Sequence, residues 1–155
     1  MHPTVLVVDD NPTVRRAIRL LIENNTNWQI CAEADNGFRA VELAKEFAPS
    51  VVILDLAMPL MNGLAAARQI SKIAPDSVMV MYTLFANEQL AKEAQAAGIR
   101  GVVSKGDATD LLTLIRRLLP STVPLNCSSA KSRKHSEARG SYNVVLNPSG
   151  GTLVE

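Results

Sequence analysis

Three carboxylates, one hydroxyl and one ammonium each follow a short apolar run of the sequence. Runs rich in Val, Ile and Leu are typical of strands that are buried on both faces of a parallel sheet. The carboxyl ends of such strands meet at one edge of the sheet, where ligand sites form. We therefore expect these five side chains to lie together: Asp9, Asp10, Asp55, Thr83 and Lys105.

The chemistry of this set follows from its charges. Three neighbouring carboxylates repel one another, so the arrangement requires a cation, and oxygen ligands suit Mg²⁺ better than Zn²⁺. The two histidines, His2 and His135, are isolated and offer no softer site. A hydroxyl and a lysine can receive the oxygens of a phosphoryl group, and an aspartate can be its nucleophilic acceptor. The set indicates metal-assisted phosphoryl transfer onto an aspartate, although Asp10 alone could simply cap a helix.

The elements that must position these side chains alternate along the chain. Apolar runs predict five strands, and segments of helical period predict a helix after each strand. This order favours an α/β fold, with a doubly wound five-stranded parallel sheet and helices on both faces. The predicted strands are Val5–Val8, Gln29–Ala34, Val51–Leu54, Val78–Tyr82 and Gly101–Val103. The first predicted helix has Asn11 as its cap and Pro12 as its first position, and the other four span Gly37–Phe47, Leu64–Ile73, Glu88–Ala97 and Asp107–Leu119.

Composition excludes several other classes of protein. The 155 residues carry a net charge of +1 and are 47% hydrophobic, so charge alone does not indicate nucleic-acid binding. The sequence contains neither a long apolar run nor a signal-peptide pattern, so we expect no membrane span and a cytoplasmic location. Two cysteines, Cys31 and Cys127, are too few for a disulfide framework and are expected to be free thiols.

The character of the sequence changes at Pro120. Residues 1–119 are predicted to form one domain, whereas residues 120–155 are rich in Ser, Pro and Gly and mildly basic, with four Lys/Arg and two Asp/Glu. Tyr142–Leu146 is the one strand-like run in this second stretch. We expect residues 120–155 to be a flexible tail or to add one loosely attached element.

Four segments carry a resemblance to a known family. They are VLVVDDNP, VVILDLAMPLMNG, MYTLF and GVVSKG, and together they make residues 3–119 resemble the receiver domains of bacterial response regulators. The resemblance implies the flavodoxin-like or CheY-like (βα)5 fold with strand order 2-1-3-4-5. It also implies that Met58-Pro59 and Asn62-Gly63 shape the loop after Asp55.

The resemblance assigns a role to each site residue. Asp55 would accept a phosphoryl group from a histidine kinase or phosphotransfer protein. The carboxylates of Asp9, Asp10 and Asp55 and the backbone carbonyl of Ala57 would hold Mg²⁺. Thr83 and Lys105 would contact the phosphoryl oxygens. The domain would be a phosphoacceptor of a two-component phosphorelay rather than an enzyme, catalysing only its own phosphorylation and dephosphorylation.

The sequence also departs from the usual receiver pattern. Gly106 stands after Lys105 where many receivers have proline, and together with the first helix, NPTVRRAIRLLIE, this looks more like the NarL/FixJ branch than the chemotaxis branch. Val102 stands where many receivers have an aromatic switch residue, and Leu84 where a small residue is common. Because Ala57 and Phe85 have no group to position water, we expect slow self-dephosphorylation.

The output of the domain is the least determined feature. After Pro120 we find no pattern of a DNA-binding helix-turn-helix, so we expect a stand-alone receiver that acts through an unknown downstream protein, not nucleic acid. A homodimer could form through the face of the fourth helix, fifth strand and fifth helix. The alternatives are a shortened NarL/FixJ-type transcriptional regulator, a receiver that binds constitutively, and an aspartate-nucleophile phosphatase. The phosphatases of this last kind need a second acid where this chain has Ala57.

Overall fold

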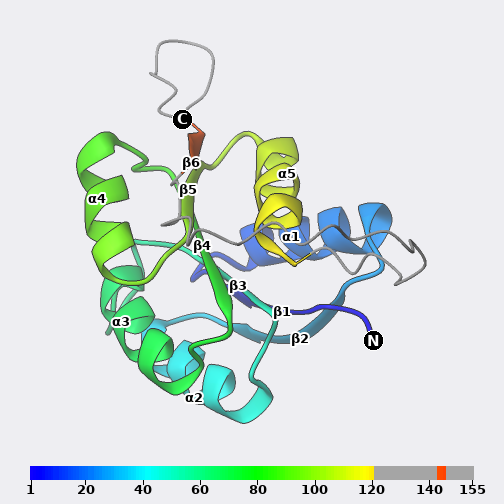
Figure 1. Cartoon of the computed structure of the whole chain (residues 1–155), viewed down its shortest axis with the longest axis horizontal. Helices are drawn as coiled ribbons and strands as arrows, with labels where there is room; N and C mark the ends of the chain where they lie inside the picture. Colours follow the sequence, from blue (N-terminus) through cyan, green and yellow to red (C-terminus); the bar gives the residue numbers. More distant parts are fainter. Residues whose placement is uncertain (121–142, 146–155) are drawn as a thin grey trace, which may run out of the picture.

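The computed structural model describes residues 1–120 and 143–145 as an α/β fold with one sheet (Figure 1). Five strands and five helices alternate through the first 118 residues, as the sequence predicts, and a sixth strand follows. The elements are β1 (Thr4–Val8), α1 (Pro12–Asn25), β2 (Gln29–Ala34), α2 (Gly37–Phe47), β3 (Val51–Leu54), α3 (Gly63–Ile73), β4 (Val78–Thr83), α4 (Glu88–Ala96), β5 (Gly101–Ser104), α5 (Ala108–Leu118) and β6 (Asn143–Val145).

All strand pairs in the sheet are parallel, and the order is β2-β1-β3-β4-β5-β6. The first five strands confirm the expected order 2-1-3-4-5. The sixth strand, β6, pairs with β5 through residues of the strand-like run Tyr142–Leu146. Residues 121–142 and 146–155 of the predicted tail, and with them Cys127, lie outside the described residues, so the flexibility expected for the tail stays a prediction.

The helices cover the sheet on two sides, which buries the central strands β1, β3 and β4 on both faces and leaves the edge strand β2 half-buried. Helices α1 and α5 lie on one face, and α2, α3 and α4 lie on the other (Figure 1). Ile18 of α1 and Leu111 of α5 pack in the first layer, while Leu43 of α2 and Ile70 of α3 pack in the second. Fully buried leucine-sized side chains each contribute about 1.5–3 kcal/mol by the transfer of apolar surface from water. Packing of these side chains on the sheet stabilises the positions of the strands and of the residues that follow them.

A side-chain cap begins each of the five helices. In every case an Asn or Asp oxygen accepts a hydrogen bond from a backbone N–H in the first turn, which would otherwise lack a partner. For α1 the cap is Asn11, which accepts from Thr13 N–H at 2.9 Å, so Asp10 is not the cap and its carboxylate is left for other contacts. The five caps are Asn11, Asn36, Asn62, Asn87 and Asp107.

Two further findings bear on expectations drawn from the sequence. Among the described helices, none is both long and apolar enough to cross a membrane. Cys31 is a free, half-buried thiol whose Sγ lies 3.4 Å from the Val5 carbonyl oxygen. Its burial raises the pKa of the thiol, so Cys31 is expected to react slowly with alkylating reagents.

The fold leaves no room for a side chain at Gly63, the first residue of α3. A Cβ there would lie 2.1 Å from the backbone oxygen of Asp55, and the Gly63 N–H donates to the Leu56 carbonyl at 2.9 Å. The segment after β3 is therefore tied directly to the start of α3, which agrees with the role expected for Asn62-Gly63.

We predict that Gly63→Ala lowers the free energy of unfolding by about 1–3 kcal/mol, because backbone atoms must move to admit the methyl group. Urea denaturation followed by the fluorescence of Trp28, the one tryptophan of the sequence, measures this change. Arg68→Ala, at an exposed position of the same helix, is the control and should change stability by less than about 0.5 kcal/mol. A Gly63→Ala chain as stable as the wild type would contradict the close approach.

Candidate functional site

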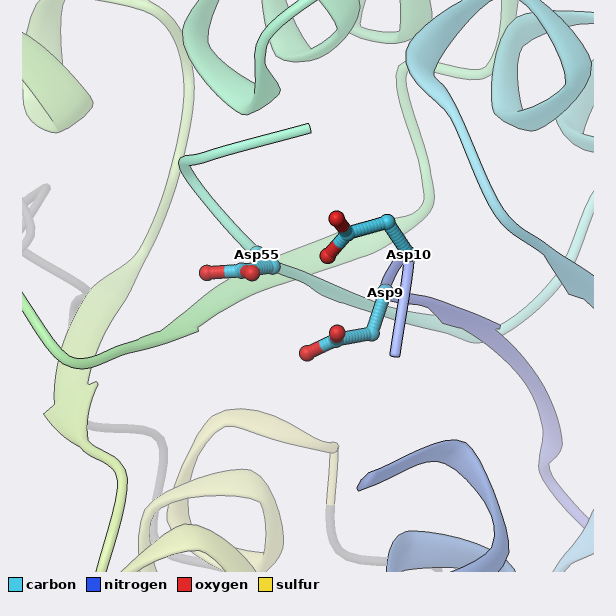
Figure 2. Close-up of side chains that lie close together, drawn as sticks. All are labelled: Asp9, Asp10 and Asp55. Atoms are coloured by element: carbon cyan, nitrogen blue, oxygen red, sulfur yellow. The ribbon is translucent and has the colours of Figure 1, made fainter. Parts of the chain in front are cut away.

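Three carboxylates meet at the carboxyl edge of the sheet. Asp9 and Asp10 directly follow β1, and Asp55 directly follows β3, the neighbouring strand. Figure 2 shows their side chains extending in the same direction, and one carboxylate oxygen from each lies within 4.8 Å of the others. Strand pairing thus brings together residues that are 45 positions apart in the sequence, as the sequence predicts.

Asp9 is the most deeply buried of the three carboxylates, with 1% of its surface exposed. Its Oδ1 accepts a hydrogen bond from the Asn11 N–H at 2.9 Å. Its Oδ2 is buried without a hydrogen bond from the described residues and has one close cation, Lys105 Nζ at 2.5 Å, which forms an ion pair. Burial raises the pKa of Asp9, and the charge of Asp55 adds to this, while Lys105 and the Asn11 N–H act against it.

Asp55 is also buried, but both of its oxygens have a partner. Oδ1 accepts from the N–H of Leu56 at 2.8 Å, and Oδ2 accepts from Lys105 Nζ at 3.0 Å. The backbone N–H of Asp55 donates to the Val8 carbonyl at 3.0 Å, which continues the pairing of β3 with β1. The carboxylate is therefore held in one orientation and faces Asp9, Asp10 and Lys105.

Lys105 joins two of the carboxylates. It follows β5, and its ammonium contacts both Asp9 Oδ2 and Asp55 Oδ2. Partial burial alone would lower the pKa of this lysine, but the hydrogen bonds and charges of the two aspartates outweigh burial and raise it. The lysine is accordingly cationic in this site and offsets part of its negative charge.

Thr83 is joined by a hydrogen bond to Lys105 but, among the described residues, not to the carboxylates. It is the last residue of β4, it is fully buried, and its carbonyl accepts the Lys105 N–H at 2.8 Å. Its hydroxyl oxygen accepts the N–H of Phe85 at 3.3 Å, and among the described residues no hydrogen bond joins this hydroxyl to Asp55. Since a hydroxyl that accepts still has a proton to donate, Thr83 can contact a group bound between Lys105 and Asp55.

Ala57 lies in the segment that carries the chain from β3 to α3. It is exposed, and its carbonyl oxygen accepts no hydrogen bond from the described residues. In the same segment Leu60 has a φ of 69°, a left-handed conformation that is uncommon for a residue other than glycine. The site is thus flanked by a free backbone acceptor in a turn that the packing of Gly63 holds in place.

The donor set fits a hard divalent cation. Its ligand atoms are all oxygens, and one of them, Asp9 Oδ2, is a buried carboxylate atom whose one close partner among the described residues is the ammonium of Lys105. Three carboxylates and one ammonium sum to a charge of −2, which one divalent cation neutralises. Oxygen-only sites with room for water are typical of Mg²⁺.

Some contacts of the site have no clear signal in the sequence. The sequence predicts Asn11 as a helix cap but not the hydrogen bond of its N–H to Asp9. Arg15, in the first turns of α1, donates from Nη1 to the Asp9 carbonyl at 2.8 Å. An exposed helical arginine is usually a solvated charge, and only the packing of α1 against β2 reveals this contact.

Comparison with known proteins extends these observations. Residues 5–116 match the family model described as response regulator receiver domain. The chain is 39% identical over 108 residues to the transcriptional regulatory protein YdfI of Bacillus subtilis, covering 70% of this chain and 50% of YdfI. It is 34% identical over 105 residues to the chemotaxis protein CheY of Halobacterium salinarum, covering 68% of this chain and 86% of that protein. The match therefore spans half the length of YdfI.

Solved structures show the same fold. The response regulator domain of Thermotoga maritima CheB superposes with a TM-score of 0.72 at 28% identity, covering 77% of this chain and 97% of the other. A LuxR-family two-component response regulator from Aurantimonas sp. SI85-9A1 gives a TM-score of 0.73 at 31% identity, covering 77% and 86%. The CheY-like arrangement of the sheet and helices is thus confirmed.

We predict that Asp10→Asn stabilises the metal-free protein, by up to about 1 kcal/mol, because it removes one of three like charges in a partly solvated site. The same substitution should reduce the stabilisation that Mg²⁺ confers, since an ion that binds the folded state more weakly stabilises it less. Urea denaturation with EDTA and with millimolar Mg²⁺ measures both effects. Asp76→Asn, at an exposed position outside the cluster, is the control. Full retention of the Mg²⁺ effect in Asp10→Asn would count against a cation site here.

Proposed function

This chain belongs to the response-regulator receiver domain family, and we propose that it is a phosphorylation-controlled signalling module whose phosphoacceptor is Asp55. The observation that carries this proposal is the position of Asp55: its buried carboxylate faces two further carboxylates and the ammonium of Lys105. The phosphoryl donor would be a phosphohistidine on a histidine kinase or phosphotransfer protein.

The proposed reaction is a phosphoryl transfer in which one oxygen of Asp55 attacks phosphorus. The phosphorus–nitrogen bond of the phosphohistidine breaks, the imidazole leaves with the electron pair and takes up a proton, and an aspartyl phosphate forms. Hydrogen bonds from the Leu56 N–H and from Lys105 keep the Asp55 carboxylate in one orientation for this attack. Such positioning supplies much of the rate enhancement in reactions of this type.

The other site residues would bind the charges of the reaction. We propose that Asp9, Asp10, Asp55 and the carbonyl of Ala57 hold Mg²⁺. When bound, Mg²⁺ neutralises and orients the oxygens of the phosphoryl group. Lys105 would exchange its contact with the Asp55 carboxylate for one with a phosphoryl oxygen. The hydroxyl of Thr83 would donate a hydrogen bond to another phosphoryl oxygen.

The movement of Thr83 would connect the site to a surface. Its hydroxyl oxygen accepts the Phe85 N–H in the segment between β4 and α4, so a displacement of the hydroxyl toward a phosphoryl group would change how that segment is held. We propose that signalling passes through altered contacts of the α4-β5-α5 face with a downstream protein or a second copy of the chain. Val102, at the position of the usual aromatic switch, is buried in β5 between β4 and β6, and its side chain has no aromatic ring that could rotate.

A second candidate function is that of a transcriptional regulator of the NarL/FixJ type with a further DNA-binding domain. The observation that favours it is the match to YdfI, a transcriptional regulatory protein, half of which is spanned by this chain. In either case we propose a cytoplasmic location and no substrate turnover beyond the phosphorylation cycle. The alanine at position 57 leaves no second acid two residues after Asp55 for phosphatase chemistry.

We predict that acetyl phosphate with Mg²⁺ adds one phosphoryl group to the wild-type chain and none to Asp55→Asn, because an amide is not a nucleophile for phosphorus. Intact-mass spectrometry measures the addition. Asp76→Asn is the matched control and should be phosphorylated as the wild type is. An unmodified wild-type chain, or an Asp55→Asn chain that still gains the group, would contradict the proposal.

We also predict that the phosphorylated chain loses its phosphoryl group slowly, over minutes or longer. Neither Ala57 nor Phe85 has a group that could position an attacking water. Ala57→Asn should speed the loss several-fold by supplying an amide at this exposed position, whereas Leu60→Asn, three residues further along the same segment, should not. The decay of the phosphorylated mass after removal of acetyl phosphate measures both rates, and a half-life of seconds in the wild type would refute the prediction.

A further inference from the structure

Arg15 connects the carboxylate cluster to the edge strand β2. Its Nη1 donates to the backbone carbonyl of Asp9 at 2.8 Å, and its Nε lies 3.4 Å from Glu33 Oε2. The side chain is 19% exposed, so it is largely packed between α1 and the sheet. An arginine held in this way has a fixed direction, because its planar guanidinium engages two acceptors at once.

Glu33 is itself held from a second side. Arg19, one helical turn after Arg15, donates to Glu33 Oε1 from Nε at 2.8 Å and from Nη2 at 2.6 Å. The Glu33 carboxylate therefore has both oxygens engaged, one by each arginine. Because the two arginines bind different oxygens of Glu33, the contact of Arg15 Nε with Oε2 does not require Arg19.

The contact with Asp9 replaces a missing partner in the sheet. Asp9 lies one residue beyond β1, where its N–H still donates to the Ala34 carbonyl at 3.1 Å, but its carbonyl has no backbone partner in the part of the chain that the structure describes. The guanidinium of Arg15 donates a hydrogen bond to this carbonyl instead. The peptide that joins Asp9 to Asp10 is consequently held from the Asp9 side, and this peptide sets the directions of both carboxylates.

We propose that Arg15 is a positioning residue for the divalent-cation site: by fixing the peptide after Asp9, it preorganises the carboxylates of Asp9 and Asp10 to bind the ion. This inference rests on the proposed function, since it assumes that the cluster binds a cation. Groups that orient metal ligands typically contribute a factor of ten or more to metal affinity.

The direction in which Mg²⁺ affinity changes when Arg15 is removed distinguishes a positioning role from a purely electrostatic one. A cationic side chain near the cluster repels a metal ion, so removing a mere neighbouring charge should tighten Mg²⁺ binding. Removing a positioning residue should weaken it. Arg19 provides the matched control, because it carries the same charge and binds the same Glu33 carboxylate, yet the described contacts include none between it and Asp9.

The experiment is a titration of the full chain with Mg²⁺ by isothermal calorimetry, for the wild type and the variants Arg15→Ala, Arg15→Lys and Arg19→Ala. We expect Arg15→Ala to raise the Kd for Mg²⁺ about tenfold. Arg15→Lys, which retains one donor, should fall between Arg15→Ala and the wild type. Arg19→Ala should leave the Kd unchanged or lower it. Circular dichroism confirms that each variant is folded at the temperature of the titration.

Three outcomes would overturn the inference: tighter or unchanged binding in Arg15→Ala, equal weakening in Arg15→Ala and Arg19→Ala, or an Arg15→Lys chain no better than Arg15→Ala. The proposed function has a separate test in the wild type. If the wild type binds Mg²⁺ and is phosphorylated on Asp55 while Arg15→Ala behaves like Arg19→Ala, the inference about Arg15 fails and the proposed function stands. If the wild type binds no Mg²⁺, the cation site itself fails.

Discussion

Electrostatic repulsion among Asp9, Asp10 and Asp55 is the constraint on which the rest of the site depends. These carboxylates are brought within 4.8 Å by the pairing of β1 with β3, and two of them are buried. Lys105 offsets only part of their charge, so the folded chain retains a site of net charge −2. Burial of charge without full compensation costs stability, and a divalent cation can recover that cost when it binds. The proposed affinity for such a cation would thus be a consequence of the fold.

Local structure keeps these charges in place. The caps at Asn11 and Asn62 begin the helices next to β1 and β3 at fixed residues, and Gly63 lets α3 start against the backbone of Asp55. Around Asp9 the backbone is held by β2 on one side and by Arg15 on the other. A site of repelling groups needs such external supports, because the groups themselves would move apart.

Much of the fold and of the candidate site was predictable from the amino-acid sequence. The five predicted strands matched β1 to β5 within about a residue at each end. For β1, β3 and β4 the reason is that continuous runs of apolar residues are typical of strands buried on both faces. The site residues followed because parallel strands place their carboxyl ends at one edge. The pairing of β6 with β5 was less predictable, since its short run follows a polar stretch that gives no indication of a sheet partner.

The sequence by itself determined the elements, their order and the set of charged groups at the strand ends, because hydrophobic periodicity and capping residues act over a few neighbouring positions. Tertiary structure alone decided which oxygen of each carboxylate meets Lys105, that Thr83 contacts Phe85 rather than Asp55, and that Arg15 binds the Asp9 carbonyl. Those contacts depend on how helices pack against the sheet, to within an ångström. Lys105 meets carboxylates at least 50 positions away in sequence, and the shorter-range contacts of Thr83 and Arg15 also depend on where the packing places β4 and α1, so no local pattern encodes them.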